Sequence, residues 1–221
     1  MYANEPVPAE QPTQRSDRDA AALAAMGADV SALCAKRLAR VAGTHGLLLD
    51  GLGTPSPAVP GVARWATLQP AQDGAVWQGR VRANLDELPF ADDCFCAVLV
   101  RFAGGFDAAG VSELARVLAP HGTLLVAGFH PRSLWQRGIA PGRWERALRA
   151  AGLDVLPAVR CGSPWPRVRG AEGLPRWLIR SAGGAWLIEA RRSVLAMLPL
   201  RKPAGRRAME PLLPGAHRQC A

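Results

Sequence analysis

The chain has 221 residues, of which 49% are hydrophobic and 20% charged, which are the proportions of a globular protein with one sizeable core. Its apolar runs are too short to span a bilayer, which excludes a helical membrane protein. Residues 1–19 are polar, acidic and rich in proline, so we expect no secretion signal and a cytoplasmic protein.

The five cysteines fit that expectation because an odd, scattered set argues against a disulfide framework. Cys94 and Cys96 would point to the same side of a strand, which is one way for a metal site to begin. No histidine or second cysteine pair lies nearby in sequence, so we expect packing instead and predict no metal.

The net charge of +9 is unevenly distributed along the chain. Residues 1–110 hold 9 Lys and Arg against 12 Asp and Glu, whereas residues 111–221 hold 18 against 6. A basic half attracts nucleic acid, anionic lipid or an acidic substrate. The alternative is a coding bias toward arginine, because Lys36 and Lys202 are the only lysines. We therefore regard nucleic acid as a possible partner but not the favoured one, and the sequence leaves the oligomeric state open.

Apolar periodicity predicts an alternation of strands and helices. The predicted elements in chain order are a helix from 17 to about 43, strands over 46–50, 62–68 and 96–102, a helix over 108–119, a strand over 122–129, a helix over 142–152, and strands over 153–161 and 183–193.

Continuously apolar strands separated by helices indicate a sheet that is covered on both faces and is mostly parallel. Right-handed crossovers then give a doubly wound α/β fold, which binds ligands at the carboxyl ends of its strands, beside the first strand. We expect one such domain over 16–201, between a disordered N-terminal tail over 1–15 and a flexible basic tail over 202–221. The proline-, tryptophan- and arginine-rich segment over 161–180 is interpreted as a lid over the substrate entrance, or as a surface that binds nucleic acid or lipid.

Three segments carry a resemblance to a known family. They are "LLLDGLGTP" over 47–55, "ANLDELPFADDCFCAVLVRF" over 83–102 and "ELARVLAPHGTLLVAGFHPRSLW" over 113–135. In this order they resemble the class I S-adenosylmethionine-dependent methyltransferases, and residues 43–201 are similar to a proteobacterial subgroup of that family. The resemblance implies a Rossmann-like fold, S-adenosylmethionine as cofactor and methyl transfer. The motifs are degenerate, because Pro55 replaces a glycine, Gln69 an acid and Cys96 an aspartate.

The resemblance implies a set of residues around the cofactor. Gly51 and Gly53 would let the backbone approach the methionine and ribose portions, where a Cβ would collide. Asp50 either reaches the cofactor or caps the turn after the strand. The amide of Gln69 can hydrogen-bond the ribose in place of an acid. Asn84, before "LPF", would accept a hydrogen bond from the adenine amino group, and a neighbouring backbone N–H would donate to a ring nitrogen. The implied cofactor-binding residues are Asp50, Gly51, Gly53, Gln69, Asn84 and Leu85.

The acceptor substrate would enter beside "RFAGGF" and "GFHPRSLW". The residues that could line its path are Phe102, His130, Arg132 and Trp135, although loop packing accounts for them equally well. No general base is visible there, and methyl transfer does not always need one when the reactants are aligned. We therefore expect a methyltransferase with an unidentified acceptor. The alternative is a catalytically inactive methyltransferase-like protein that binds partners through its basic half.

Overall fold

The structure is a computed structural model that describes residues 17–53, 56–71, 76–104, 106–131, 133, 138–162 and 183–193. Side chains are described from residue 23 onward. In this part of the chain the helices are α1 (Asp17–Leu38), α2 (Ala108–Val117) and α3 (Pro141–Ala150). The strands are β1 (Gly43–Asp50), β2 (Val62–Pro70), β3 (Trp77–Gly79), β4 (Arg82–Ala83), β5 (Phe95–Arg101), β6 (Leu118–Phe129), β7 (Asp154–Val155), β8 (Val159–Cys161) and β9 (Ala185–Arg191).

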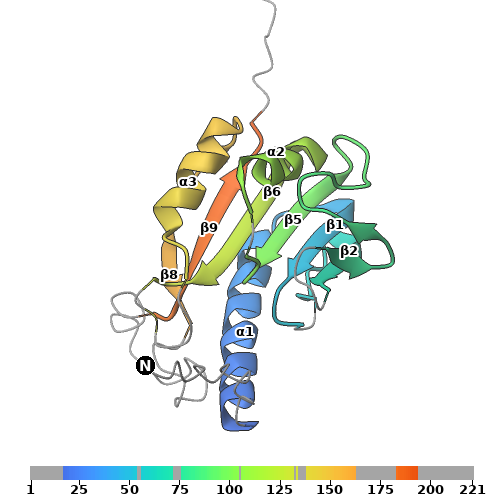
Figure 1. The fold of residues 1–221 in the computed structure, drawn as a ribbon. Coiled ribbons are helices and arrows are strands. Elements are labelled where there is room, and N and C mark those ends of the chain that lie inside the picture. The colour runs from blue at the N-terminus through green and yellow to red at the C-terminus, as the bar shows by residue number, and fades with distance from the viewer. Residues whose placement is uncertain are drawn as a thin grey trace, which may run out of the picture.

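The described strands form one sheet in the order β4-β3-β2-β1-β5-β6-β9-β7, with β8 also paired to β9. The central strands β2, β1, β5 and β6 run parallel to one another. Strand β9 is antiparallel to β6, and β3 is antiparallel to both β2 and β4. The predicted doubly wound, mostly parallel α/β sheet is therefore confirmed (Figure 1).

Helices cover both faces of the sheet, as the continuously apolar strands require. On one face α2 and α3 pack against alternate residues of the central strands, such as Leu47, Val98 and Leu124. On the other face α1 packs against the intervening residues, such as Leu48 and Leu99. We call these the α2–α3 face and the α1 face. None of the three described helices is long and apolar enough to cross a bilayer.

Local chemistry explains where the two shorter helices begin. Asp107 caps α2, because its Oδ1 accepts a hydrogen bond of 2.9 Å from the N–H of Gly110. Helix α3 starts with Pro141, whose fixed φ suits the first helical position. These starts place residues 106 and 107 beside the first turns of α3, where two cavities described below are found.

Four details differ from the predicted elements. Helix α1 ends at Leu38 and not near Gly43, which begins β1. Helix α2 gives way to β6 at Leu118, before the expected turn. The predicted strand over 153–161 is interrupted, because only its two ends, β7 and β8, pair with β9. The short strands β3 and β4 were not predicted, since two or three residues give no periodicity.

The connection from β1 to β2 contains no helix in its described residues, 51–53 and 56–61. It returns along the α1 face, where Val59 is buried in the same core as Met26 and Leu48. Parallel strands are usually joined by a crossover helix that covers one face of the sheet. Here the loop between β1 and β2 and the helix α1 cover that part of the α1 face instead. The predicted tails over 1–15 and 202–221, and most of the predicted lid over 161–180, lie outside the described residues.

Candidate functional site

The sheet has its topological switch point between β1 and β5. After β1 the chain continues to β2 on one side, and after β5 it continues through α2 to β6 on the other. In doubly wound sheets, ligands bind outside the carboxyl ends of the strands at such a point. The residues at these two ends are Asp50 and Arg101, which are paired in the parallel register.

Asp50 and Arg101 form a buried ion pair at this switch point. The Nη2 of Arg101 lies 3.2 Å from the Oδ2 of Asp50, and both side chains are fully buried. Arg101 also donates a hydrogen bond through Nη1 to the hydroxyl of Ser31 on α1. Burial lowers the pKa of Arg101, and the Asp50 carboxylate opposes that shift. The carboxylate therefore binds an internal cation, which is a role that the sequence analysis did not identify.

The strand alternation explains why Asp50 meets Arg101. Leu49 packs in the core of the α2–α3 face, whereas Leu48 packs on the α1 face, so Asp50 points toward the α1 face. Leu99 is also on the α1 face, and Arg101 follows it by two residues. In its other expected role, capping the turn, Asp50 accepts a long hydrogen bond of 3.5 Å from the N–H of Leu52.

Gly51 lies against the backbone that leaves β5. Its N–H donates to the carbonyl of Arg101 at 2.8 Å, and a Cβ at this position would lie 2.2 Å from the carbonyl oxygen of Phe102. Phe102 itself has a φ of 49°, and its ring packs on Phe129 with centroids 4.5 Å apart. Glycine is thus required at position 51 by the chain itself, whether or not a ligand approaches it.

The other cofactor candidates lie along the carboxyl edge of the sheet, and three of them, Gly53, Gln69 and Asn84, are exposed. Gly53 is exposed and has a φ of 68°. A Cβ added at this position would lie 3.8 Å from the side-chain nitrogen of Gln69. Strand β4 runs in the direction of β2 because both are antiparallel to β3, so Asn84 and Leu85 follow its carboxyl end at the same edge. Gln69 and Asn84 are exposed and Leu85 is half-buried. The amide groups are therefore accessible to a ligand, and their role as cofactor contacts stays a prediction.

Two of the four candidate acceptor residues are described. Phe102 lines a cavity, and the N–H of His130 donates to the carbonyl of Gly184 just beyond β6. Arg132 and Trp135 lie outside the described residues, as does Pro55.

Cys96 does not belong to the carboxyl edge. It is the second residue of β5, and its thiol donates to the carbonyl of His45 at 3.1 Å. Cys96, where the resemblance implies an aspartate, therefore lies at the opposite, amino end of the sheet. Among the described residues, no three His, Cys, Asp or Glu side chains are grouped so that they could hold a metal ion.

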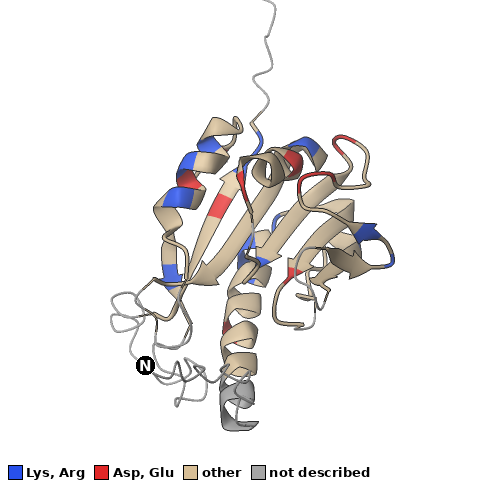
Figure 2. Cartoon of the chain, in the orientation of Figure 1, with Lys and Arg blue, Asp and Glu red and all other residues tan. Residues whose placement is uncertain are grey.

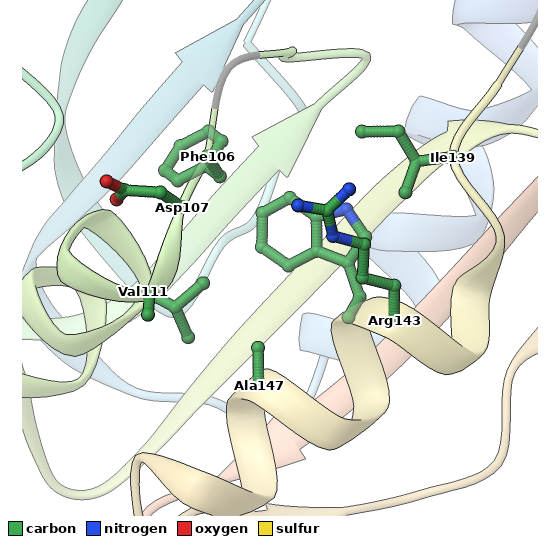
Figure 3. A pocket seen from close by; sticks show the side chains of 8 residues that line it. Phe106, Asp107, Val111, Ile139, Arg143 and Ala147 are labelled. Atoms are coloured by element: carbon green, nitrogen blue, oxygen red, sulfur yellow. The ribbon is translucent and has the colours of Figure 1, made fainter.

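Two cavities open beside the loop that follows β5, and Figure 3 shows the first of them. The first, of about 190 Å³, lies between α2 and α3, and the second, of about 150 Å³, lies at the ends of β5 and β6. Ile139 and Trp144 line both cavities and separate them. None of the six predicted cofactor residues lines either cavity. The sequence analysis missed these cavities because their lining comes from distant segments with no shared motif.

No protein-family model matches the sequence, and the search of curated proteins gave no match. Solved structures do match. An S-adenosylmethionine-dependent methyltransferase from Aquifex aeolicus has a TM-score of 0.53 at 10% identity, over 80% of this chain and 94% of that chain. The [4+2]-cyclase SpnF has a TM-score of 0.52 at 19% identity, over 75% and 80% of the two chains. The YcgJ protein of Bacillus subtilis has a TM-score of 0.50 at 16% identity, over 74% and 98%.

These similarities define the class of fold. The chain has the fold of the class I methyltransferases, with a mostly parallel central sheet flanked by helices. Because the identities are low, the similarity extends to the fold and not to a particular activity.

Proposed function

We propose that the chain is an S-adenosylmethionine-dependent methyltransferase that acts on an unidentified acceptor. The observation that carries this proposal is the position of two exposed amides, Gln69 and Asn84, at the carboxyl edge of the sheet on the β2 side of the switch point. Doubly wound sheets bind nucleosides at that edge. The methyltransferase fold of the chain supports the same reading.

The described residues fit the nucleoside half of the cofactor better than the methionine half. Gln69 would hydrogen-bond the ribose, and Asn84 with the backbone of Leu85 would bind the adenine. Asp50 does not fit a cofactor contact, since its carboxylate is fully buried against Arg101. We therefore assign the recognition of the cofactor to the side of β2 and β4.

The chemistry would depend on alignment. When bound, S-adenosylmethionine supplies a methyl group on a sulfonium, which a nitrogen, sulfur or ionised oxygen nucleophile can displace. The protein would hold the acceptor beside Phe102, in the cavity whose described lining residues include no acid or base. Holding two reactants in line accounts for much of the rate in reactions of this kind.

Calorimetric titration of the full chain with S-adenosylmethionine, and with its demethylated product, tests the proposal. We expect saturable binding that weakens about tenfold in Gln69→Ala and in Asn84→Ala, since each loses a hydrogen bond to the ligand. The matched control is Arg64→Gln, because Arg64 is an exposed residue near the amino end of β2, away from the predicted cofactor residues. Absence of binding at millimolar ligand would contradict the proposal.

A second candidate is a catalytically inactive binding protein with the methyltransferase fold. The internal pairing of Asp50 and the lack of a helix in the described residues between β1 and β2 favour it. A protein of similar fold is described as a cyclase, so the fold alone does not require methyl transfer. Such a protein would bind through its basic half, where α3 exposes Arg143, Arg146 and Arg149 (Figure 2).

A gel-shift titration with duplex DNA and with RNA at several salt concentrations tests the second candidate. If the arginines on α3 contact phosphates, affinity should fall steeply as salt rises, because each contact releases counterions. Replacing Arg146 and Arg149 by glutamine should reduce the slope. Binding that does not depend on salt would count against this function.

A further inference from the structure

We propose that the 190 Å³ cavity between α2 and α3 is a binding site for a small carboxylate that carries one aromatic ring. The cavity is separate from the predicted cofactor residues, so the inference does not depend on methyl transfer. Its lining comes from the loop after β5, the first turn of α2, the segment just before α3 and the first two turns of α3 (Figure 3). The lining residues are Phe106, Asp107, Ala108, Val111, Ile139, Arg143, Trp144 and Ala147.

The interior of this cavity is apolar and partly aromatic. Phe106 and Trp144 form two of its walls, with ring centroids 5.1 Å apart and planes inclined by 55°. Val111, Ile139 and Ala147 contribute aliphatic surface. Aromatic rings favour tilted or offset contacts with one another, so a third ring can pack against this pair.

The volume limits the ligand to one ring with a short substituent. A cavity of about 150 Å³ lined by aliphatic and aromatic side chains admits benzene. The present cavity of about 190 Å³ leaves room for one further small group. The cavity is small for a nucleoside or a fused ring system, because sites for larger ligands occupy about 300 Å³ or more.

The one cation in the lining is Arg143, which is exposed and forms no salt bridge within the described part of the chain. Figure 3 shows its guanidinium extending from α3 toward the side of the cavity formed by Phe106. The nearby acid, Asp107, points away from it and is used to cap α2. The guanidinium is thus available to an anion, and its planar fork suits a carboxylate.

Titration of the full chain with phenylacetate, followed by calorimetry and by amide chemical shifts, tests the inference. Phenylacetamide has the same shape without the charge, and acetate has the charge without the ring. We expect phenylacetate to bind at least tenfold more tightly than either, because one loses the charged hydrogen bonds and the other the apolar burial. Equal affinity for phenylacetate and acetate, or no binding of phenylacetate at 10 mM, would overturn the proposal.

Two substitutions locate the site. Arg143→Gln should abolish the preference for phenylacetate over its amide, whereas Arg146→Gln, one turn along the same exposed face, should retain it. Ala147→Leu should remove binding by filling the cavity while the charge stays in place. Ala150→Leu, an exposed position on α3, is its control. If Arg143→Gln and Ala147→Leu both bind like the unmodified chain, the site does not lie here.

Because these measurements omit S-adenosylmethionine, their result is separate from the test of the proposed function. Binding of phenylacetate without any binding of S-adenosylmethionine would support the cavity and contradict the methyltransferase. The reverse result would contradict the cavity alone.

Discussion

Two arginines at the same end of the sheet differ in what surrounds them. Arg101 on the α1 face is fully buried and bound to Asp50 and Ser31. Arg143 on α3 is exposed beside an apolar cavity and has no acidic partner within the described residues. A buried charge must be paired inside the protein, whereas an exposed charge at the rim of a cavity can bind an outside group. Burial and pairing, more than position near the switch point, therefore distinguish a structural charge from a binding one.

The largest expected effect comes from breaking the buried pair. Asp50→Ala leaves Arg101 charged and buried without its partner, and should lower the free energy of unfolding by about 3–5 kcal/mol. Replacing both residues, as Asp50→Leu with Arg101→Met, should recover most of that loss. Urea unfolding measures both. Arg149→Ala, which removes an exposed pair with a separation of 3.7 Å, is the control and should cost less than about 1 kcal/mol.

If Asp50→Ala cost no more than that control, the carboxylate would not be structural, and a role at the cofactor would become the better explanation for it.

The next effect concerns the glycine beside the same pair. Gly51→Ala places a Cβ against the carbonyl oxygen of Phe102 and should destabilise the fold by about 1–3 kcal/mol. Gly104→Ala is matched to it, because a Cβ there meets nothing within 4 Å, and should stay within about 0.5 kcal/mol. Thermal unfolding of the two variants gives the comparison. Equal stability would mean that the loop after β1 has room for a side chain.

A smaller effect is a dependence of the free energy of unfolding on pH, which arises from two thiols buried on the α1 face. Burial raises the pKa of the Cys34 and Cys161 thiols from 9.0 to about 12. Between these values the unfolded chain loses thiol protons that the folded chain keeps, so stability falls as pH rises. We expect a decrease of about 1.4 kcal/mol per pH unit for each thiol.

Urea unfolding at pH 9, 10 and 11, within the window between the two pKa values, measures that slope. Cys34→Ala should make it shallower, while Cys94→Ala, at a half-buried position, should change it less. Identical slopes in all three proteins would show that the α1 face admits water to its thiols.

The smallest effect is expected on the α3 side. Gly142 lies in the first turn of α3, where an added Cβ meets nothing within 4 Å. Gly142→Ala should therefore raise stability by about 0.5–1 kcal/mol, because alanine loses less conformational freedom in a helix. Thermal unfolding detects the change. A loss of stability would indicate that the chain before α3 needs the freedom of glycine.

The sequence predicts the arrangement of the sheet well, because long apolar strands such as β5 and β6 carry a strong signal. The fold class is confirmed, and most predicted strands and helices lie within a few residues of their observed ends. Short strands and the helix-free return from β1 to β2 escaped prediction, since tertiary pairing, and not local periodicity, defines them.

The candidate site is harder to predict, because it depends on register. Alternation predicts that Asp50 shares a face with Leu48, but only the pairing of β1 with β5 places Arg101 beside it. A shift of one residue would have put the two side chains on opposite faces. The cofactor roles of Gly51, Gly53 and Gln69 stay predictions, as do those of Asn84 and Leu85.

Helix α1 joins segments that are made at very different times on the ribosome. Its Arg37 pairs at 3.3 Å with Glu189 of β9, which lies 152 residues later in the chain. At a typical synthesis rate, roughly 10–30 s separate the two residues. The core around Met26 and Val30 is therefore complete only when β9 has been added, because Ala185 and Leu187 of that strand belong to it. Ribosome-bound chains that end before β9 should accordingly be the aggregation-prone species.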